Sequence, residues 1–121
     1  MMAAYIPEKG DIVHLQFDPS TGGEMQGKHY ALVLSPKSFN RATGLIFACH
    51  VSQGSGGVAR SSGMLSTLQG SGTHTLGNVH CHQLKSLDWK IRQAAFKEKV
   101  PDFVLQDVLA RVESVLFDEN D

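Results

Sequence analysis

The stretch "GDIVHLQFDP", residues 10–19, decides the fold because it shows one β-strand together with its start and its end. Apolar and polar side chains alternate over residues 12–17, and this period of two predicts a half-buried strand. The step Asp18-Pro19 then ends the strand, because proline has no N–H to donate to a neighbouring strand. The apolar side chains on one face are Val13, Leu15 and Phe17.

Further short strands are expected along the rest of the chain. They are YALVLS (30–35), LIFACHVS (45–52), MLSTL (64–68), GNVHCHQ (77–83) and KIRQAAF (90–96). A short helical turn is expected within residues 36–44. Several short strands joined by glycine-rich turns are typical of a small barrel or a strongly curved sheet.

The C-terminal part has the pattern of an amphipathic helix. It starts at Pro101-Asp102, because proline is tolerated in the first turn and aspartate is favourable beside the positive end of the helix dipole. The apolar stripe at helical spacing consists of Val104, Leu105, Val108, Leu109, Val112, Val115 and Leu116. We expect this helix to pack on the sheet, with its end available for a dimer contact. The expected fold is mainly β (α+β), in a single domain of residues 1–121.

Composition excludes several classes of function. Eleven basic and 12 acidic side chains give a formal charge of −1, so no bulk charge indicates nucleic-acid binding and any anion site must be local. No run approaches the length of a membrane span. Neither glycine-rich loop has the spacing of a phosphate-binding loop, so no nucleotide cofactor is expected. Cys49 and Cys81 show no disulfide or metal pattern; as buried reduced thiols they favour a cytoplasmic setting.

Five segments that follow one another at a characteristic spacing indicate a family. They are KGDIVHLQFDPSTGGEMQGK (9–28), ALVLSPKSFNRATG (31–44), VSQGSGGVARSSG (51–63), GNVHCHQLKSLDWKIR (77–92) and VPDFVLQDVLARVESVL (100–116). Over about residues 8–117 the chain resembles the PemK/MazF family of toxin–antitoxin ribonucleases.

The resemblance implies a fold, an activity and a set of partners. The implied fold is an SH3-like curved barrel with a C-terminal helix. The implied activity is sequence-specific, metal-independent cleavage of single-stranded mRNA by a cytoplasmic homodimer, with no cofactor and no membrane. A cognate antitoxin would inhibit the toxin, and operator DNA would be bound only in complex with that antitoxin.

The residues at the family's catalytic positions differ from the usual ones. His29 stands where the family has an arginine before the second strand, and Ser52 stands where it has a threonine after the third. The family segment R-C-D-Q reads "HCHQ" here, so His80 and His82 replace an arginine and an aspartate. The resemblance therefore implies an intact fold with a changed active site.

Histidines are suited to metal-free cleavage of RNA, which needs a base for the 2′-hydroxyl proton and an acid for the leaving oxygen. We expect His29 and His80 to share these two roles and Ser52 to contact the scissile phosphate. Such a site would favour mildly acidic pH. The substrate-binding residues that we expect are Glu24, Lys28, Gln53, Arg60, His82 and Gln83.

Alternatives remain open at this point. The first is a homologue with weakened or no catalysis that binds antitoxin, and operator DNA with it, without cutting RNA. A metal site at His80 and His82 would need a third ligand, for which His50 and His74 are candidates. Gyrase-poisoning relatives share the barrel but not the opening motif. Trp89 is expected as a packed anchor, with base stacking as the alternative.

Overall fold

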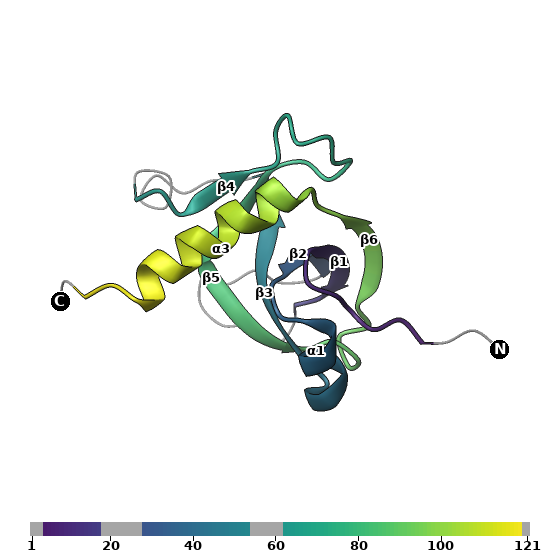
Figure 1. Ribbon diagram of the computed structural model, residues 1–121. Helices are drawn as coiled ribbons and strands as arrows, with labels where there is room; N and C mark the ends of the chain where they lie inside the picture. The colour runs from purple at the N-terminus through teal and green to yellow at the C-terminus, as the bar shows by residue number, and fades with distance from the viewer. Residues whose placement is uncertain (1–3, 18–27, 54–61, 120–121) are drawn as a thin grey trace.

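The computed structural model describes residues 4–17, 28–53 and 62–119 of the 121-residue chain. Figure 1 shows a curved sheet with a long helix lying across one side of it. The elements in chain order are β1 (Asp11–Gln16), β2 (Lys28–Val33), α1 (Lys37–Thr43), β3 (Leu45–Ser52), β4 (Leu65–Thr67), β5 (Asn78–Asp88), β6 (Ala95–Lys99) and α3 (Asp102–Leu116).

The six strands form one antiparallel sheet in the order β4-β5-β3-β2-β1-β6. Its two end strands, β4 and β6, do not pair with each other in the described part of the chain, so the expected curved barrel is open at this edge. A side chain bridges the edge instead: the carboxylate of Glu98 in β6 accepts hydrogen bonds from the backbone N–H groups of His74 and Thr75. The segment after β4 is thereby attached to β6.

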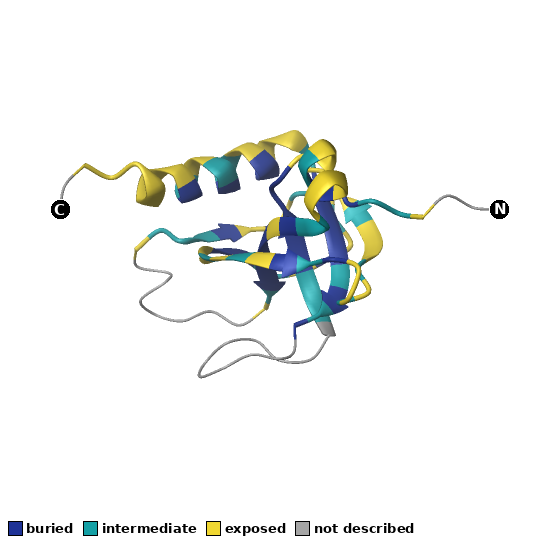
Figure 2. Cartoon of the chain, turned by 90° about the horizontal axis from the view of Figure 1, so that it is seen from below, coloured by how far each residue is buried: buried dark blue, intermediate teal, exposed yellow. Residues whose placement is uncertain are grey.

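Each face of the sheet has its own apolar core, as expected for strands that alternate their side chains. One core lies beneath α3, whose buried positions point toward the sheet in Figure 2. It includes Ile12, Leu32, Cys49, Cys81, Val104, Leu105, Val108 and Val112. The other core lies on the opposite face and includes Val13, Leu15, Phe17, Ala31, Val33, Ile46, Ala48, Leu87 and Trp89.

Most of the expected elements are confirmed, but the last strand is displaced. β3 has the expected bounds, α1 lies within residues 36–44, and α3 begins at Asp102. The strand expected over 90–96 is wrong, because residues 90–93 belong to a turn in which the Asp88 carboxylate accepts hydrogen bonds from two backbone N–H groups. The strand β6 therefore begins only after this turn.

The strand expected over 77–83 continues to Asp88, and its register against β3 shifts in the middle. Cys49 pairs with Leu84, whereas Val51, only two residues later, pairs with Val79. The four residues 80–83 of β5 therefore lie opposite a single residue of β3, His50. Such a bulge bends a strand and redirects its side chains. It brings histidines from β3 and β5 together.

Expectations about the rest of the chain have mixed outcomes. Both cysteines are buried and free, and Trp89 is a packed anchor whose indole N–H donates to the backbone oxygen of Asn40. The apolar stripe of α3 is buried at its start, but Val115 and Leu116 near its end are exposed. No helix in the described ranges combines the length and the apolar character needed to cross a bilayer.

Candidate active site

A hydrogen bond between Ser52 and His80 is the centre of the candidate site. The Ser52 hydroxyl lies at the end of β3, and its Oγ is 2.9 Å from Nε2 of His80 in β5. The His80 side chain is buried, whereas Ser52 is half-buried. A hydroxyl in this position can donate to the neutral ring or accept from the protonated one. The pair can therefore carry a proton between the protein interior and the surface.

His50 packs directly on this pair. Its ring is stacked on the His80 ring with the centroids 4.1 Å apart, and its Nδ1 is buried without a hydrogen-bond partner. Burial lowers the pKa of His50 to about 4, with further lowering from the positive charges that His80, His82, Lys85 and His29 carry when protonated. His50 is therefore a neutral spacer at physiological pH.

Phe17 connects these histidines to His29 in β2. The Phe17 ring is stacked on His29 at 6.1 Å and meets His50 edge-on at 6.2 Å. The four rings of His29, Phe17, His50 and His80 are called the ring cluster below. The ring cluster therefore links the two expected catalytic histidines through two intervening rings.

A pocket of about 470 Å³ opens beside the ring cluster and brings three of the expected site residues together. This volume lies within the range of small-molecule sites. We call it the Ser52 pocket; the residues that line it are His29, Tyr30, Val51, Ser52, Gln53, His74, Thr75, Leu76 and Lys97. His80 reaches this pocket through its hydrogen bond to Ser52.

The other expected substrate-binding residues have different surroundings. His82 is exposed, with its ring 5.7 Å from that of His80. Gln83 is half-buried, and its amide oxygen has no hydrogen-bond partner. Lys28 is the first residue of β2, but its side chain is not described. Glu24 and Arg60 lie outside the described residues.

The alternative metal site lacks a third ligand in the described part of the chain. There, no three His, Cys, Asp or Glu side chains are arranged to hold a metal ion. His74, one of the candidates for a third ligand, belongs to the segment held by Glu98 and lines the Ser52 pocket.

Sequence reasoning left the role of His50 open and missed the contacts of Phe17. A signal for His50 was present: it alternates with Ala48 and Ser52 along one strand, so the three side chains share a face. Phe17 was assigned only to the core. Its position at the end of the apolar face of β1 is what brings it next to histidines from two other strands.

Protonation of His50 is expected to destabilise the protein between about pH 6.5 and pH 4. The folded-state pKa of His50 is lowered, so the unfolded chain binds the proton first and stability falls as the pH falls through this interval. The shift from 6.5 to about 4 corresponds to at most about 3 kcal/mol, and solvent screening reduces this to on the order of 2 kcal/mol.

The measurement is urea unfolding at a series of pH values for the wild type and for His50→Phe. This variant keeps an aromatic ring but binds no proton, so its stability should change less over the interval. His14→Phe, at a half-buried position in β1 whose ring faces Tyr30, is the matched control. If the stability of the wild type and of His50→Phe changed equally with pH, the loss of stability could not be assigned to protonation of His50.

Comparison with known proteins assigns the chain and its fold to one family. The model of a family described as PemK-like, MazF-like toxin of type II toxin–antitoxin system matches residues 8–116. The chain is 37% identical to endoribonuclease PemK of Escherichia coli over 109 residues, which are 90% of this chain and 81% of PemK. It is 31% identical to the endoribonuclease toxin MazF of Escherichia coli strain K12 over 112 residues, 93% of this chain and 96% of MazF.

Solved structures of MazF proteins have the same fold as this chain. MazF from Deinococcus radiodurans has a TM-score of 0.83 and 35% sequence identity, with 93% of this chain and 98% of that chain covered. The MazE–MazF structure from the same organism has a TM-score of 0.80 and 34% identity, with 96% and 100% covered.

Proposed function

The chain belongs to the family of PemK-like, MazF-like toxins of type II toxin–antitoxin systems, and on this premise we propose that it is an endoribonuclease that cleaves single-stranded RNA. The observation that carries the proposal is the hydrogen bond between Ser52 and His80 at the edge of the Ser52 pocket. His29 lines the same pocket and supplies a second imidazole.

The two imidazoles suit cleavage by the RNA's own 2′-hydroxyl. His29 accepts the 2′-hydroxyl proton, the 2′-oxygen attacks the adjacent phosphorus, and the bond from phosphorus to the 5′-oxygen breaks. Protonated His80 donates to the Ser52 oxygen, which frees the Ser52 hydroxyl proton for the leaving 5′-oxygen. The products are a 2′,3′-cyclic phosphate and a 5′-hydroxyl end. No step requires a metal ion, because the nucleophile is part of the substrate and the protons move between side chains.

Substrate contacts follow from the lining of the Ser52 pocket. Gln53 and Lys97 line the same pocket as Ser52 and offer an amide and an ammonium group to the phosphate or the sugar. Tyr30 and His74 offer rings on which a base of single-stranded RNA can stack. His82 and Gln83 extend the contact surface beyond His80. Glu24, Lys28 and Arg60 are retained as proposed contacts on the family pattern alone.

The partners that we propose are a second copy of the chain and a cognate antitoxin, in the cytoplasm and away from membranes. The MazE–MazF structure of Deinococcus radiodurans, which this chain matches over almost its whole length, supports the antitoxin. An exposed apolar surface near the end of α3 supports a protein partner of this kind. Its residues are Val115, Leu116 and Phe117. Operator DNA is proposed only as a ligand of the toxin–antitoxin complex, and residues 1–121 as one domain.

A non-cleaving homologue that only binds antitoxin is the second candidate. It is favoured by the lining of the Ser52 pocket: the basic groups come from two histidines and a lysine, and the described lining holds no guanidinium. Arginine holds a phosphate with two parallel hydrogen bonds and a permanent charge, which histidine does not.

Incubation of purified protein with end-labelled RNA across pH 5 to 8, with EDTA present, separates the two candidates. We expect fragments with 2′,3′-cyclic phosphate ends and a loss of roughly 100-fold in kcat for Ser52→Ala, the usual effect of removing one preorganised donor. Ser52→Thr keeps the hydroxyl and should retain most activity. Ser38→Ala, at an exposed position on α1, is the control. Absence of cleavage at every pH, with intact antitoxin binding, would favour the second candidate.

A further inference from the structure

One wall of the Ser52 pocket is formed by a segment that belongs to no strand. His74, Thr75 and Leu76 line the pocket from the connection between β4 and β5. Within this connection, the Thr73 hydroxyl donates to the backbone oxygen of Thr75 at 2.8 Å. This hydrogen bond shapes the segment locally but does not attach it to the rest of the pocket.

Glu98 in β6 makes the attachment across the open edge of the sheet. Its Oε1 accepts a hydrogen bond from the His74 N–H at 3.0 Å. Its Oε2 accepts from the Thr75 N–H at 2.7 Å and from the Thr75 hydroxyl at 2.6 Å. The preceding residue of β6, Lys97, itself lines the pocket. Because β4 and β6 are not paired in the described residues, the Glu98 carboxylate holds these two sides of the pocket together (Figure 1).

The attachment is strong because the carboxylate is ionised. Partial burial acts to raise the pKa of Glu98, but the hydrogen bonds from Thr75 and His74 outweigh it and hold the pKa below its ordinary value. Hydrogen bonds to an ionised acceptor are roughly twice as strong as those between neutral groups. Thr75 is buried, so its N–H and hydroxyl would have no ready partner if the carboxylate were removed. The segment would then have to move toward water.

The charge of Glu98 gives this role a clear alternative. A carboxylate close to a site for a polyanion repels the substrate, so electrostatics alone predicts that RNA binds better when Glu98 is removed. If the carboxylate holds the wall of the pocket in place, its removal should instead weaken binding. The two explanations therefore predict opposite changes in the KM for RNA.

We propose that Glu98 is a positioning residue of the Ser52 pocket, which acts through His74 and Thr75 by holding the wall against which the substrate binds. This role rests on the proposed function, since it concerns the same substrate and the same pocket. Glu98 itself contacts no reacting atom and takes no part in proton transfer.

The test measures kcat and KM separately for cleavage of the end-labelled RNA, at a temperature at which thermal unfolding shows every variant to be folded. We expect Glu98→Ala to raise KM roughly 10-fold, the usual effect of losing one charge-assisted hydrogen bond, and to change kcat less than about 3-fold. Glu98→Gln keeps one acceptor oxygen, but its amide nitrogen cannot accept from the remaining N–H. Its KM should therefore lie between those of the wild type and Glu98→Ala.

Two further variants show whether the effect passes through Thr75. Thr75→Val removes the hydroxyl that donates to Glu98 and keeps the size of the side chain. Glu98→Ala should therefore raise KM less in the Thr75→Val background than in the wild type, because part of the same contact is already lost. Glu8→Ala, which removes an exposed carboxylate, is the matched control and should leave both kcat and KM unchanged.

The outcomes separate this role from the proposed function. If the wild type cleaves RNA and a folded Glu98→Ala protein has an unchanged or lower KM, the positioning role alone is overturned. A fall in kcat as large as that of a general acid or base, with KM unchanged, would place Glu98 in the chemistry and also overturn it. Failure of the wild type to cleave any RNA would overturn both the role and the proposed function.

Discussion

Replacement of His80 by alanine is expected to lower kcat for RNA cleavage by about 10³-fold, in the middle of the range for removal of a general acid or base. The variant loses the ring that is hydrogen-bonded to Ser52 and stacked on His50. Ser52 then has no partner to receive or supply its proton. The KM for RNA should change far less, because His80 is buried and reaches the Ser52 pocket only through Ser52.

Two further variants separate chemistry from structure. His80→Gln can keep a hydrogen bond to Ser52 but does not exchange a proton near neutral pH, so it should be almost as inactive as His80→Ala while unfolding at nearly the wild-type temperature. His82→Ala removes an exposed histidine two residues away on the same strand and should lower kcat less than about 10-fold. Wild-type kcat in a folded His80→Gln protein would remove His80 from the mechanism.

Replacement of Gly77 by alanine is expected to destabilise the protein by about 3–4 kcal/mol and to lower cleavage as well. Gly77 has a φ of +110°, which disfavours a side chain, and an added Cβ would clash with the backbone oxygen of Ser52. The end of β3 would have to move to relieve this contact. Since Ser52 and Gln53 both line the Ser52 pocket, the movement would also displace the proposed catalytic hydroxyl.

Gly72 provides the matched control for this substitution. It has a φ of +91°, but nothing lies within 4 Å of an added Cβ. Gly72→Ala should therefore cost only the backbone strain, about 1–2 kcal/mol, and leave kcat unchanged. Urea unfolding and cleavage assays on the two variants measure the difference. Equal destabilisation by both would mean that the close approach to Ser52 has no energetic consequence.

The strands of the fold could be predicted from the sequence because they are short apolar or alternating segments bounded by glycine, proline and polar residues. β3 was found with its bounds, and α3 was found from its proline start and its apolar stripe. The last strand was misplaced because alternation over 90–96 gives no sign of the turn that the Asp88 carboxylate stabilises. The Gln93 backbone, with a φ of +55°, is a conformation that no side-chain pattern predicts.

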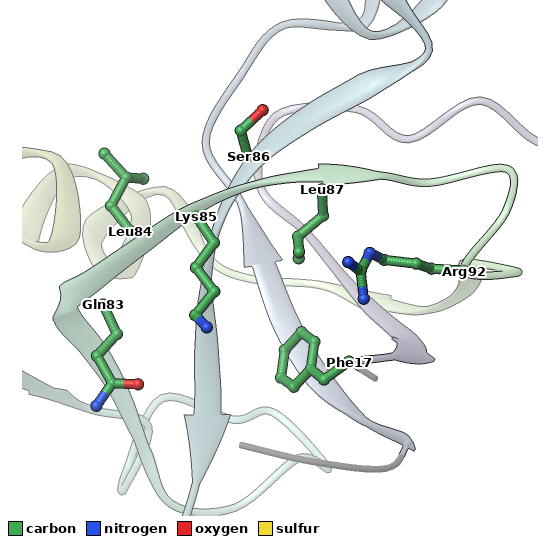
Figure 3. Close-up of a pocket in the computed structure, with 7 residues that line it drawn as sticks. All are labelled: Phe17, Gln83, Leu84, Lys85, Ser86, Leu87 and Arg92. Carbon is green, nitrogen blue, oxygen red and sulfur yellow. The ribbon is translucent and has the colours of Figure 1, made fainter. Parts of the chain in front are cut away.

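The candidate site was predictable as a set of residues but not as an arrangement. His29, Ser52 and His80 were identified from the positions at which they replace family residues. The stacking of His80 on His50 depends on the bulge in β5, and a register shift leaves no trace in the period of a sequence. The pocket lined by Lys85 and Arg92 (Figure 3) was missed for a related reason. Lys85 and Arg92 are separated by a turn, and only the folding of that turn brings them to one space.

The two buried cysteines offer a practical consequence. Burial raises the pKa of the Cys49 thiol to about 12, with a smaller contribution from neighbouring Cys81, and raises that of Cys81 to about 11. Both thiols are protonated at physiological pH and shielded beneath α3, so neither should react with alkylating reagents while the protein is folded. Their rate of labelling therefore reports how often α3 lifts from the sheet, without any engineered probe.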